Sequence, residues 1–594
     1  MGTRKGHGND YPQRIEDTIN GRTYERGKFL GKGGFAKCFE FRRIRSGGGA
    51  DLFAGKIVPK SLLVKQHQRE KMAQEIKIHR ELNHKNIVKF YASFQCDRFV
   101  FIVLEICKKK SLMELHKRRG HITEPETRYY MFQLCEGISY LHQRNIIHRD
   151  LKLGNIFLSD EMSIKIGDMG LATQLEYASQ RRRTLCGTPN YIAPEILVKK
   201  GHSLEVDIWS TGCIMYTLLV GKPPFETSSL KETYSKIKKC EYTIPEDKVG
   251  PSACSLITQM LSSMPERRPK VNQILEHDFV KIGYMPKRLP SSALSCPPRL
   301  TEEQMSFSVT RQPMISIAKD NEEEIMQPVI KKTTQASSED LRAQEQANGI
   351  RDLRTLLNML TDIALEAKEL NSAVLPDDCE HPSSSPIYWI SKWVDYSDKY
   401  GIGYQLCDNS VGVLYNDQTR MILHEDGEQV QYLTKNMKEE MFRLSVDKPE
   451  LKKKVSLVNY FKKYMNEHLL KAGAAVAPKE PDQLARLPFL QTWFRTRRAI
   501  CLWLSNGSIQ INWFESHEKI VLCSKMKALT FLLQNGQSIT YSSDLIIKHG
   551  ITSDLKEKIK YARNMVKKLM RPSDSGTSSA RTTTTPQTTP LRKT

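Results

Sequence analysis

The sequence predicts an α+β protein of several domains, and two observations support this prediction. Strand-like and helix-like apolar patterns are dense from about residue 24 to residue 279, and a stretch rich in proline, serine and acidic residues follows. Order resumes near residue 353, and the chain then contains two similar segments about one hundred residues apart. Because that offset is far longer than a solenoid repeat, the pattern indicates a duplicated domain.

Length, charge and cysteine use limit the possible functions. The 594 residues can bury several cores, and the net charge of +23 favours an acidic partner or simply a solvated basic surface. Nothing resembles a nucleic-acid motif with interleaved aromatic residues, so no nucleic-acid partner is expected. The 13 cysteines include no C-x-x-C pair, which argues for reduced thiols and against a zinc site. The longest apolar run, 208–220, is too short to span a bilayer, so we expect a soluble protein without a membrane partner.

The segment 148–155, His-Arg-Asp-Leu-Lys-Leu-Gly-Asn, places an acid, a lysine and an amide at fixed offsets. Asp150 is suited to accept the proton of a substrate hydroxyl, and Asn155 to hold a metal ion on ATP. Lys152 would neutralise the phosphoryl oxygens during transfer. Asp168 would coordinate Mg²⁺, because a carboxylate is a hard oxygen ligand. The sequence therefore predicts phosphoryl transfer from ATP with Mg²⁺ as cofactor.

Three segments in one order, 148–155, 168–170 and Ala-Pro-Glu at 193–195, resemble the signature of protein kinases. In that pattern Lys152 and the stretch 187–191 mark serine/threonine kinases. Met169 stands where kinases usually have phenylalanine. Because methionine is apolar and adaptable, we expect an active enzyme with a shifted balance between active and inactive arrangements. A pseudokinase is the alternative.

A glycine-rich turn at 31–36 would let backbone approach the phosphates of ATP, although such a turn alone could be a simple hairpin. Lys56, on an apolar strand-like run, would bind the α- and β-phosphates and pair with Glu75, which lies in a helical stretch. A surface ion pair is the alternative for these two residues. By resemblance to kinases, the remaining ATP-binding residues are Leu30, Gly31, Gly33, Cys38, Ala54, Leu104, Glu105, Cys107 and Phe157.

A switch is expected between Asp168 and Glu195, where three arginines precede Thr184. Arg149, next to the catalytic acid, could receive a phosphate on Thr184 and so order the loop, and an unmodified threonine is the alternative. Glu195 is expected to pair with a buried Arg268 as a structural contact.

Each copy of the duplicated domain carries a tryptophan, a polar turn, alternating strands and a final helical pattern. A helix with apolar residues three and four apart, around Leu356, precedes the first copy. Together with the kinase signature and the linker, this organisation resembles the polo-like kinase family over nearly the whole sequence. The resemblance is closest to the mitotic polo kinase type, through residues 29–38 and 393–401.

The resemblance implies a bilobal protein-kinase fold followed by two polo boxes, each a six-stranded antiparallel sheet with a helix. The implied segments are a disordered N-terminus (1–22), a kinase domain (23–280), a flexible linker without a core (281–346), a cap helix and connector (347–388), the first polo box (389–468), an inter-box linker (469–488), the second polo box (489–571) and a disordered tail rich in Ser, Thr and Pro (572–594).

In this family the boxes bind phosphoserine or phosphothreonine peptides, and the matching positions here are Trp393, Leu469, His517 and Lys519. His517 and Lys519 are two apart on an expected strand, so both would face one phosphate. Trp393 would offer a flat wall for the peptide. A solvated strand face is the alternative for the histidine and the lysine.

The resemblance also implies partners and a place in the cell. The partners would be protein substrates, docking proteins that carry phosphoserine or phosphothreonine, and an upstream kinase acting on Thr184. The protein would occupy cytoplasm and nucleus, and in dividing cells the centrosome, kinetochore, spindle and midbody, with roles in mitosis and cytokinesis. The rival interpretations are a catalytically weak phosphopeptide-docking scaffold and a kinase associated with nucleic acid.

Overall fold

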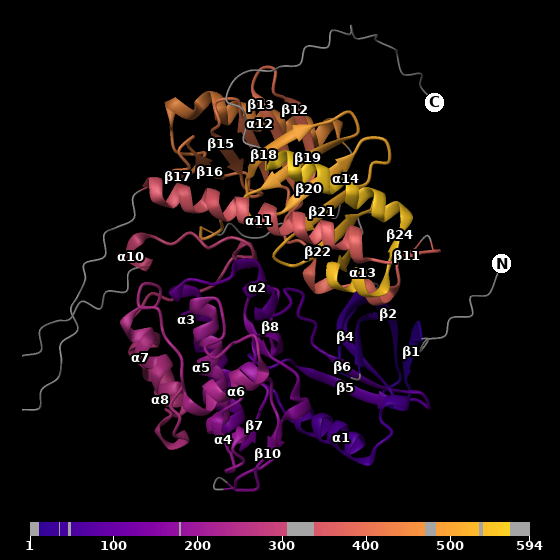
Figure 1. Cartoon of the computed structure of the whole chain (residues 1–594), viewed down its shortest axis with the longest axis vertical. Helices are drawn as coiled ribbons and strands as arrows, with labels where there is room; N and C mark the ends of the chain where they lie inside the picture. Colours follow the sequence, from indigo (N-terminus) through magenta and orange to yellow (C-terminus); the bar gives the residue numbers. More distant parts are fainter. Residues whose placement is uncertain are drawn as a thin grey trace, which may run out of the picture.

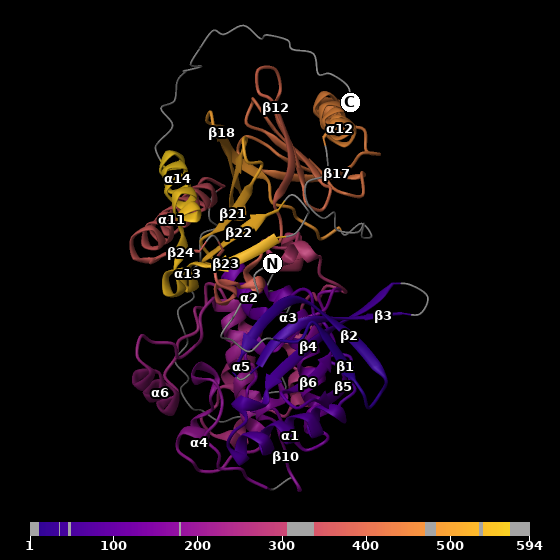
Figure 2. The same cartoon turned by 90° about the vertical axis from the view of Figure 1, so that its right-hand side faces the viewer.

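The computed structural model describes residues 11–34, 36–45, 49–177, 180–305, 338–372, 374–469, 483–533 and 538–570. A two-lobed N-terminal half and a strand-rich C-terminal half lie one above the other (Figure 1, Figure 2). Among the helices of these ranges, none is both long and apolar enough to cross a membrane.

The N-terminal lobe is a six-stranded sheet in the order β1-β2-β3-β4-β6-β5 with helix α1 (Gln66–Arg80) against it. Aromatic residues that alternate along the strands make its core, and Gly55 is required because a Cβ there would meet the Phe41 ring at 2.1 Å. The strands are β1 (Arg14–Asp17), β2 (Arg22–Gly33), β3 (Ala36–Ile44), β4 (Ala50–Pro59), β5 (Phe90–Gln95) and β6 (Phe99–Leu104).

The expectation of a disordered N-terminus is wrong for residues 11–22, because β1 pairs with β2 there. Ile15 is buried, and the Tyr11 ring lies 5.4 Å from that of Phe39. Two apolar side chains in a polar stretch are enough to attach the segment to the sheet. Residues 1–10 lie outside the described part of the chain.

The second lobe is mainly helical and is built around α5 (Glu205–Val220), which is buried along nearly its whole length. Helix α3 (Glu124–His142) begins with a capping box in which Thr123 and Glu126 satisfy each other's backbone N–H groups. The other helices are α2 (Leu112–Arg119), α4 (Pro194–Leu197), α6 (Leu230–Lys239), α7 (Pro251–Met260), α8 (Val271–Glu276) and α9 (Asp278–Lys281), and the short strands are β7 (Ile146–Ile147), β8 (Ile156–Leu158), β9 (Ile164–Ile166) and β10 (Thr173–Gln174).

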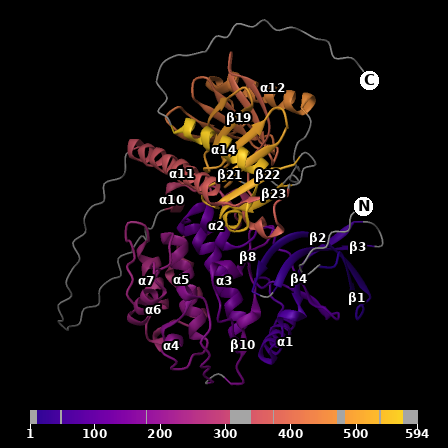
Figure 3. The same ribbon diagram turned by 45° about the vertical axis from the view of Figure 1, so that its right-hand side comes forward.

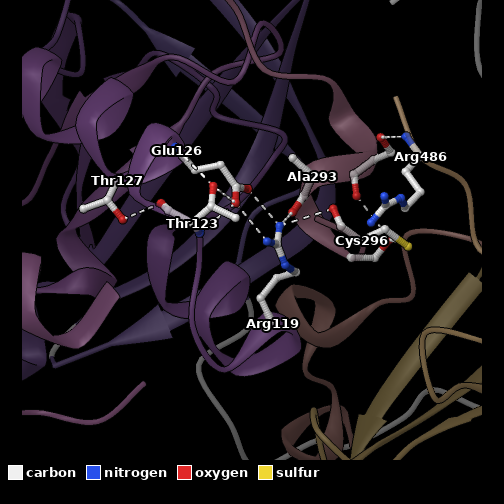
Figure 4. Close-up of polar contacts among 9 residues, drawn as sticks. Arg119, Thr123, Glu126, Thr127, Ala293, Cys296 and Arg486 are labelled. Carbon is white, nitrogen blue, oxygen red and sulfur yellow. Dashed lines mark hydrogen bonds and ion pairs between the residues drawn. The ribbon is translucent and has the colours of Figure 1, made fainter. Parts of the chain in front are cut away.

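The start of the expected linker is not free of a core. Leu289, Ala293 and Leu294 are buried with the helical lobe. Arg119 binds both carboxylate oxygens of Glu126 at 2.9 Å and also donates to the carbonyl of Ala293 at 2.6 Å (Figure 4). A buried guanidinium thus satisfies the backbone of a proline-rich segment, which composition alone did not reveal. The helix α10 (Glu302–Met305) follows, and residues 306–337 lie outside the described ranges.

The C-terminal half contains two six-stranded antiparallel sheets whose strands follow one another in sequence, which confirms the duplication. The first has α12 (Lys452–His468) on it, and the second has α14 (Ser553–Leu569). The first sheet comprises β12 (Ile390–Tyr396), β13 (Gly401–Leu406), β14 (Val411–Tyr415), β15 (Arg420–Leu423), β16 (Gln429–Leu433) and β17 (Glu439–Arg443). The second comprises β18 (Leu490–Arg495), β19 (Ala499–Leu504), β20 (Ile509–Trp513), β21 (Lys519–Cys523), β22 (Ala528–Leu532) and β23 (Ser538–Ser542).

Helix α11 (Ser338–Glu366) lies along α14 and shares its core, as expected for a cap. Strand β11 (Glu369–Leu370) pairs in parallel with β24 (Ile551–Thr552), next to α13 (Ser543–His549). A separate apolar cluster with residues from both sheets joins the two boxes.

The two halves touch at the end of α2 (Figure 3). Arg118 donates to the carbonyls of Ser383 and Ser385 at 3.1 and 3.0 Å, although only 8 % of this residue is exposed. Lys32 of the glycine-rich turn lies 3.8 Å from Asp378. The connector between α11 and the first box therefore borders both kinase lobes.

Candidate functional site

The acid of segment 148–155 is held by three side chains. Lys152 Nζ and Asn155 Nδ2 donate to Asp150 Oδ2 at 2.7 and 2.9 Å. Thr188 donates its hydroxyl proton to Asp150 Oδ1 at 2.7 Å and accepts a hydrogen bond from Lys152 Nζ at 2.9 Å. A buried carboxylate with these partners has a fixed orientation toward a group that approaches it.

Asp207, at the start of α5, positions the loop from behind. Its carboxylate accepts the backbone N–H groups of His148 and Arg149, each at 2.9 Å, and lies 3.0 Å from His142 Nε2. Burial alone would raise the pKa of Asp207, but the contact with His142 and these hydrogen bonds hold it below its usual value. The carboxylate therefore stays ionised and fixes the backbone on which Asp150 stands.

Strand β4 and helix α1 bring a lysine and a glutamate together. Lys56 Nζ lies 2.6 Å from Glu75 Oε1 and 4.0 Å from Asp168 Oδ1. Burial opposes the charge on Lys56, but the two carboxylates outweigh it and raise its pKa. Burial likewise works against the charge of Asp168, whose pKa Lys56 nevertheless lowers. Both shifts favour the charged forms of Lys56 and Asp168, as a nucleotide phosphate site requires.

The oxygen donors fit a hard divalent cation. Asp168 has a left-handed backbone with φ of 60°, and its carboxylate accepts the N–H of Gly170 at 3.4 Å. Asn155 uses its amide nitrogen on Asp150, which leaves the amide oxygen as a metal donor. Met169, which lies between Asp168 and Gly170 in the sequence, is fully buried in the core of the second lobe. Its packing role agrees with the expectation from sequence.

The residues expected around ATP lie on neighbouring strands and on the connection after them. In the strand register Gly31 is opposite Cys38, which in turn is opposite Lys56. Ala54 is opposite Leu104. Leu30 and Gly33 flank Gly31 on β2, Glu105 and Cys107 follow β6, and Phe157 is in β8. The positions on β2, β3, β4 and β6 therefore lie in one sheet, Glu105 and Cys107 come just after it, and Phe157 lies on the separate β8–β9 pair. The contact of these residues with ATP stays a prediction.

Thr184 is exposed to solvent in the activation segment, the stretch between Asp168 and Glu195. Arg149 Nε donates to the carbonyl of Leu171 at 2.7 Å. Burial, together with the charge of Arg182, lowers the pKa of the Arg149 guanidinium. Two arginines that repel each other form a place where an added phosphate would be attracted.

The structural pair expected between Glu195 and Arg268 is confirmed. The guanidinium binds both carboxylate oxygens, at 2.7 and 2.8 Å, and both side chains are buried. The same guanidinium lies 5.0 Å from the Trp209 ring on α5. The pair ties the end of the activation segment to the helical core.

In the C-terminal half, strand β12 of the first box contacts the second box near Trp393 and Lys519. Trp393 on β12 lies 6.2 Å from the ring of Phe514, which follows β20. Lys519 Nζ donates to the carbonyl of Ser391 on β12 at 2.8 Å. Burial lowers the pKa of Lys519 to about 8, so this lysine loses its proton more easily than an exposed lysine.

His517 is not on a strand, which corrects the reason given for placing it beside Lys519. Strand β21 begins at Lys519, and His517 is in the preceding turn, exposed, with φ of 54°. The turn therefore sets the direction of the imidazole, and strand alternation does not. Leu469 directly follows α12 and packs against the core of the first box. The shared role of the four residues stays a prediction.

Sequence reasoning missed Thr188 as a site residue, although its segment was used to distinguish serine/threonine kinases. Only the folded chain shows that its hydroxyl joins Asp150 to Lys152. Phe514 and the carbonyl of Ser391 were also missed, because no local pattern marks an aromatic or a backbone oxygen as part of a site between two boxes.

The described residues contain no cluster of three or more His, Cys, Asp or Glu suited to a metal. All 13 cysteines are free thiols. The magnesium prediction therefore depends on Asp168 and Asn155 together with phosphate oxygens, as is usual for a nucleotide-bound ion.

Comparisons with known proteins agree with this geometry. Residues 24–280 match the protein kinase domain, and residues 398–455 and 496–559 match the POLO box duplicated region. The chain is 50% identical over 563 residues to the serine/threonine-protein kinase PLK1 of Xenopus tropicalis, covering 94% of this chain and 93% of the relative. It is 48% identical over 568 residues to the serine/threonine-protein kinase polo of Drosophila melanogaster, covering 94% and 97%. Since the catalytic geometry and both boxes are present in a chain so similar to these relatives, it belongs to the polo-like serine/threonine protein kinases.

Proposed function

We propose that this kinase transfers the γ-phosphoryl group of ATP to serine or threonine hydroxyls of proteins that its polo boxes recognise through a phosphorylated residue. The observation that carries the catalytic part is the set of hydrogen bonds that fixes Asp150. These hydrogen bonds come from Lys152, Asn155 and Thr188. They fix the orientation of a buried carboxylate that would accept the proton of a substrate hydroxyl. The same arrangement gives no reason to favour a catalytically weak scaffold.

Each residue has a distinct task in the proposed reaction. Asp150 accepts the hydroxyl proton of the substrate, and Lys152, whose ammonium contacts both Asp150 and Thr188, offers positive charge to the phosphoryl oxygens. Lys56, fixed by Glu75, holds the phosphates of ATP. Asp168 and Asn155 would hold Mg²⁺, which when bound neutralises charge on the phosphates. Leu30, Gly31, Gly33, Cys38, Ala54, Leu104, Glu105, Cys107 and Phe157 would enclose the nucleotide.

The second part of the proposal assigns phosphopeptide recognition to Trp393, Leu469, His517 and Lys519. It is supported by the contact of Lys519 with β12, since that contact brings a cation of the second box next to the Trp393 strand of the first. The half-buried ammonium of Lys519 donates to a neutral carbonyl and, among the described residues, to no carboxylate, so a phosphate that binds it would be stabilised. The aromatic wall of Trp393 and Phe514 would pack against the peptide.

Regulation and location form the third part. We infer that an upstream kinase phosphorylates Thr184, whose exposure makes it accessible, and that Arg149 then binds the phosphate. Phosphopeptide binding would direct the enzyme to centrosome, kinetochore, spindle and midbody in dividing cells, and to partners in cytoplasm and nucleus, with roles in mitosis and cytokinesis. These proposals rest on membership of the polo-like family.

A direct test uses purified full-length protein, casein, ATP and Mg²⁺. We expect phosphate to be incorporated into casein serine and threonine, and we expect the Asp168→Asn variant to lose most of this activity while it still binds a Ser-phosphothreonine-Pro peptide. Equal turnover by wild type and the variant would contradict the catalytic assignment, and loss of both activities would indicate a folding defect.

A further inference from the structure

The second polo box contains a basic hollow that neither the catalytic nor the phosphopeptide assignment uses. It has a volume of about 520 Å³ and lies between the β18–β19 turn and the last turns of α14. Four of its lining side chains are cations, and none is a carboxylate: Arg497 and Arg498 on the turn, Lys567 and Lys568 on the helix. Such a concentration of one charge raises the local concentration of anions.

The cations are available for a ligand. Arg497, Arg498, Lys567 and Lys568 are all exposed, and no carboxylate among the described residues forms an ion pair with Arg497, Arg498 or Lys567. Lys568 Nζ lies 6.0 Å from the Phe494 ring, an exposed cation–π contact that costs little to leave. The positive charges are therefore not neutralised within the structure.

The turn that borders the hollow is fixed by hydrogen bonds. Thr496 Oγ1 and the Tyr561 hydroxyl share a hydrogen bond of 2.8 Å that joins the turn to α14. Thr496 Oγ1 also accepts the backbone N–H groups of Arg498 and Ala499 at 3.2 and 3.0 Å. The turn that carries the two arginines is thus anchored to the helix that carries the two lysines.

The equivalent position in the first box has side chains of a different kind. Its equivalent hairpin and helix, β12–β13 and α12, meet through Tyr396, whose ring lies 5.8 to 6.5 Å from those of Tyr460, Phe461 and Tyr464. The duplicated fold therefore places an aromatic cluster in one box and cations in the other. A cationic cluster has no packing role that would explain it.

The charges suit a compact dianion better than a membrane or a nucleic acid. The apolar face of α14, with Leu555, Ile559, Ala562 and Val566, is buried in the core and leaves nothing to insert into lipid. The one aromatic ring in the lining, Tyr561, is half-buried and tied to Thr496, so it offers no stacking platform for bases. A phosphate monoester matches the cluster in charge and in its demand for several donors.

The chain itself supplies a segment that could carry such a group. Residues 571–594 follow α14 directly, half of them are serine or threonine, and Asp574 is their one acidic residue. Ser575 is five residues beyond Met570, a reach of about 17 Å when extended, while Lys567 lies one helical turn back. Because the cations are exposed and screened by solvent, their affinity for a free peptide is weak, and tethering favours a ligand in the same chain.

We propose that the hollow bounded by Arg497, Arg498, Lys567 and Lys568 binds the segment after α14 when a serine or threonine of that segment carries a phosphate monoester. The modification is a phosphoryl transfer from ATP to the side-chain hydroxyl, which releases ADP and a proton. Without the phosphate, the basic segment is repelled. This site is separate from the groove at Trp393 and does not rest on the proposed function.

The test measures fluorescence anisotropy of a labelled peptide of residues 570–582 with phosphate on Ser575, added to the full chain. The His517→Ala/Lys519→Met background removes the other candidate site. We expect Arg497→Ala with Lys567→Ala to weaken binding by about tenfold or more. The matched control, Lys527→Ala with Lys548→Ala, removes two charges elsewhere on the same box and should change the affinity less than about twofold.

A second arm tests the source of the ligand. Full chain with phosphoserine installed at position 575 should bind the labelled peptide less than full chain with unmodified Ser575, because its own segment fills the hollow. Equal binding of the two proteins would overturn the proposal that the ligand is in cis. Equal affinity for the unphosphorylated peptide, insensitivity to the pocket substitutions, or binding of vesicles with 30% phosphatidylserine in place of the phosphopeptide would overturn the phosphate site itself.

Discussion

The catalytic site and the proposed phosphopeptide site solve opposite electrostatic problems. In the kinase domain Asp150 is bound by three side chains, and Lys56 is paired with Glu75, so each charge has a partner in the same domain. In the polo boxes the half-buried Lys519 donates to a neutral carbonyl of Ser391. The comparison teaches that catalytic groups, which must keep one geometry, form ion pairs and hydrogen bonds within the protein. A recognition site can instead contain a cation that has no carboxylate partner until its ligand binds.

The largest effect expected is on the chemical step, and it should leave the other site untouched. Asp150→Asn keeps the shape of the residue but removes the proton acceptor, so we expect kcat to fall by about 10³-fold. Steady-state phosphorylation of casein measures this loss, and calorimetry with a Ser-phosphothreonine-Pro peptide provides the control. A parallel fall in phosphopeptide affinity would show that the two sites are coupled and would break the comparison.

The reverse experiment removes recognition and keeps catalysis. His517→Ala with Lys519→Met deletes two donors to one phosphate, so we expect the phosphopeptide Kd to rise by at least about 100-fold. Lys519→Met keeps most of the apolar stem and therefore limits damage to the core. Casein turnover by the full-length double variant is expected to match that of wild type, and undiminished peptide binding would remove both residues from the site.

How far the sequence predicts each site follows from how local the site is. Asp150, Lys152 and Asn155 lie within six residues, so their spacing alone reveals their chemistry. Lys519 and Ser391 are 128 residues apart and meet only because the two boxes share an apolar cluster. The left-handed turn at His517 and the packing of the proline-rich stretch around Ala293 likewise depend on tertiary contacts. Resemblance to a family supplied Trp393 and His517, and residue patterns did not.

An intermediate effect is expected at the activation segment. Thr184→Val removes the hydroxyl that would be phosphorylated, so no phosphate would offset the repulsion between Arg149 and Arg182. We expect activity of protein purified from dividing cells to fall by about tenfold or more, since one charge-assisted bond is worth that much. Thr184→Asp should restore part of it. Equal turnover of wild type and the valine variant would eliminate the switch.

The smallest effect expected is the dependence of phosphopeptide affinity on the protonation of Lys519. Burial lowers the pKa of Lys519 to about 8, so its charged fraction falls by about tenfold between pH 7 and pH 9, and phosphopeptide affinity should fall with it. The peptide phosphate is a dianion throughout that range and contributes no slope. Lys519→Arg stays protonated and should flatten the profile, because a guanidinium keeps its proton at these pH values. If the affinity of the arginine variant still fell steeply with pH, the titrating group would be a residue other than Lys519. Lys519 would then keep its proton over this pH range, as Lys56 does beside Glu75.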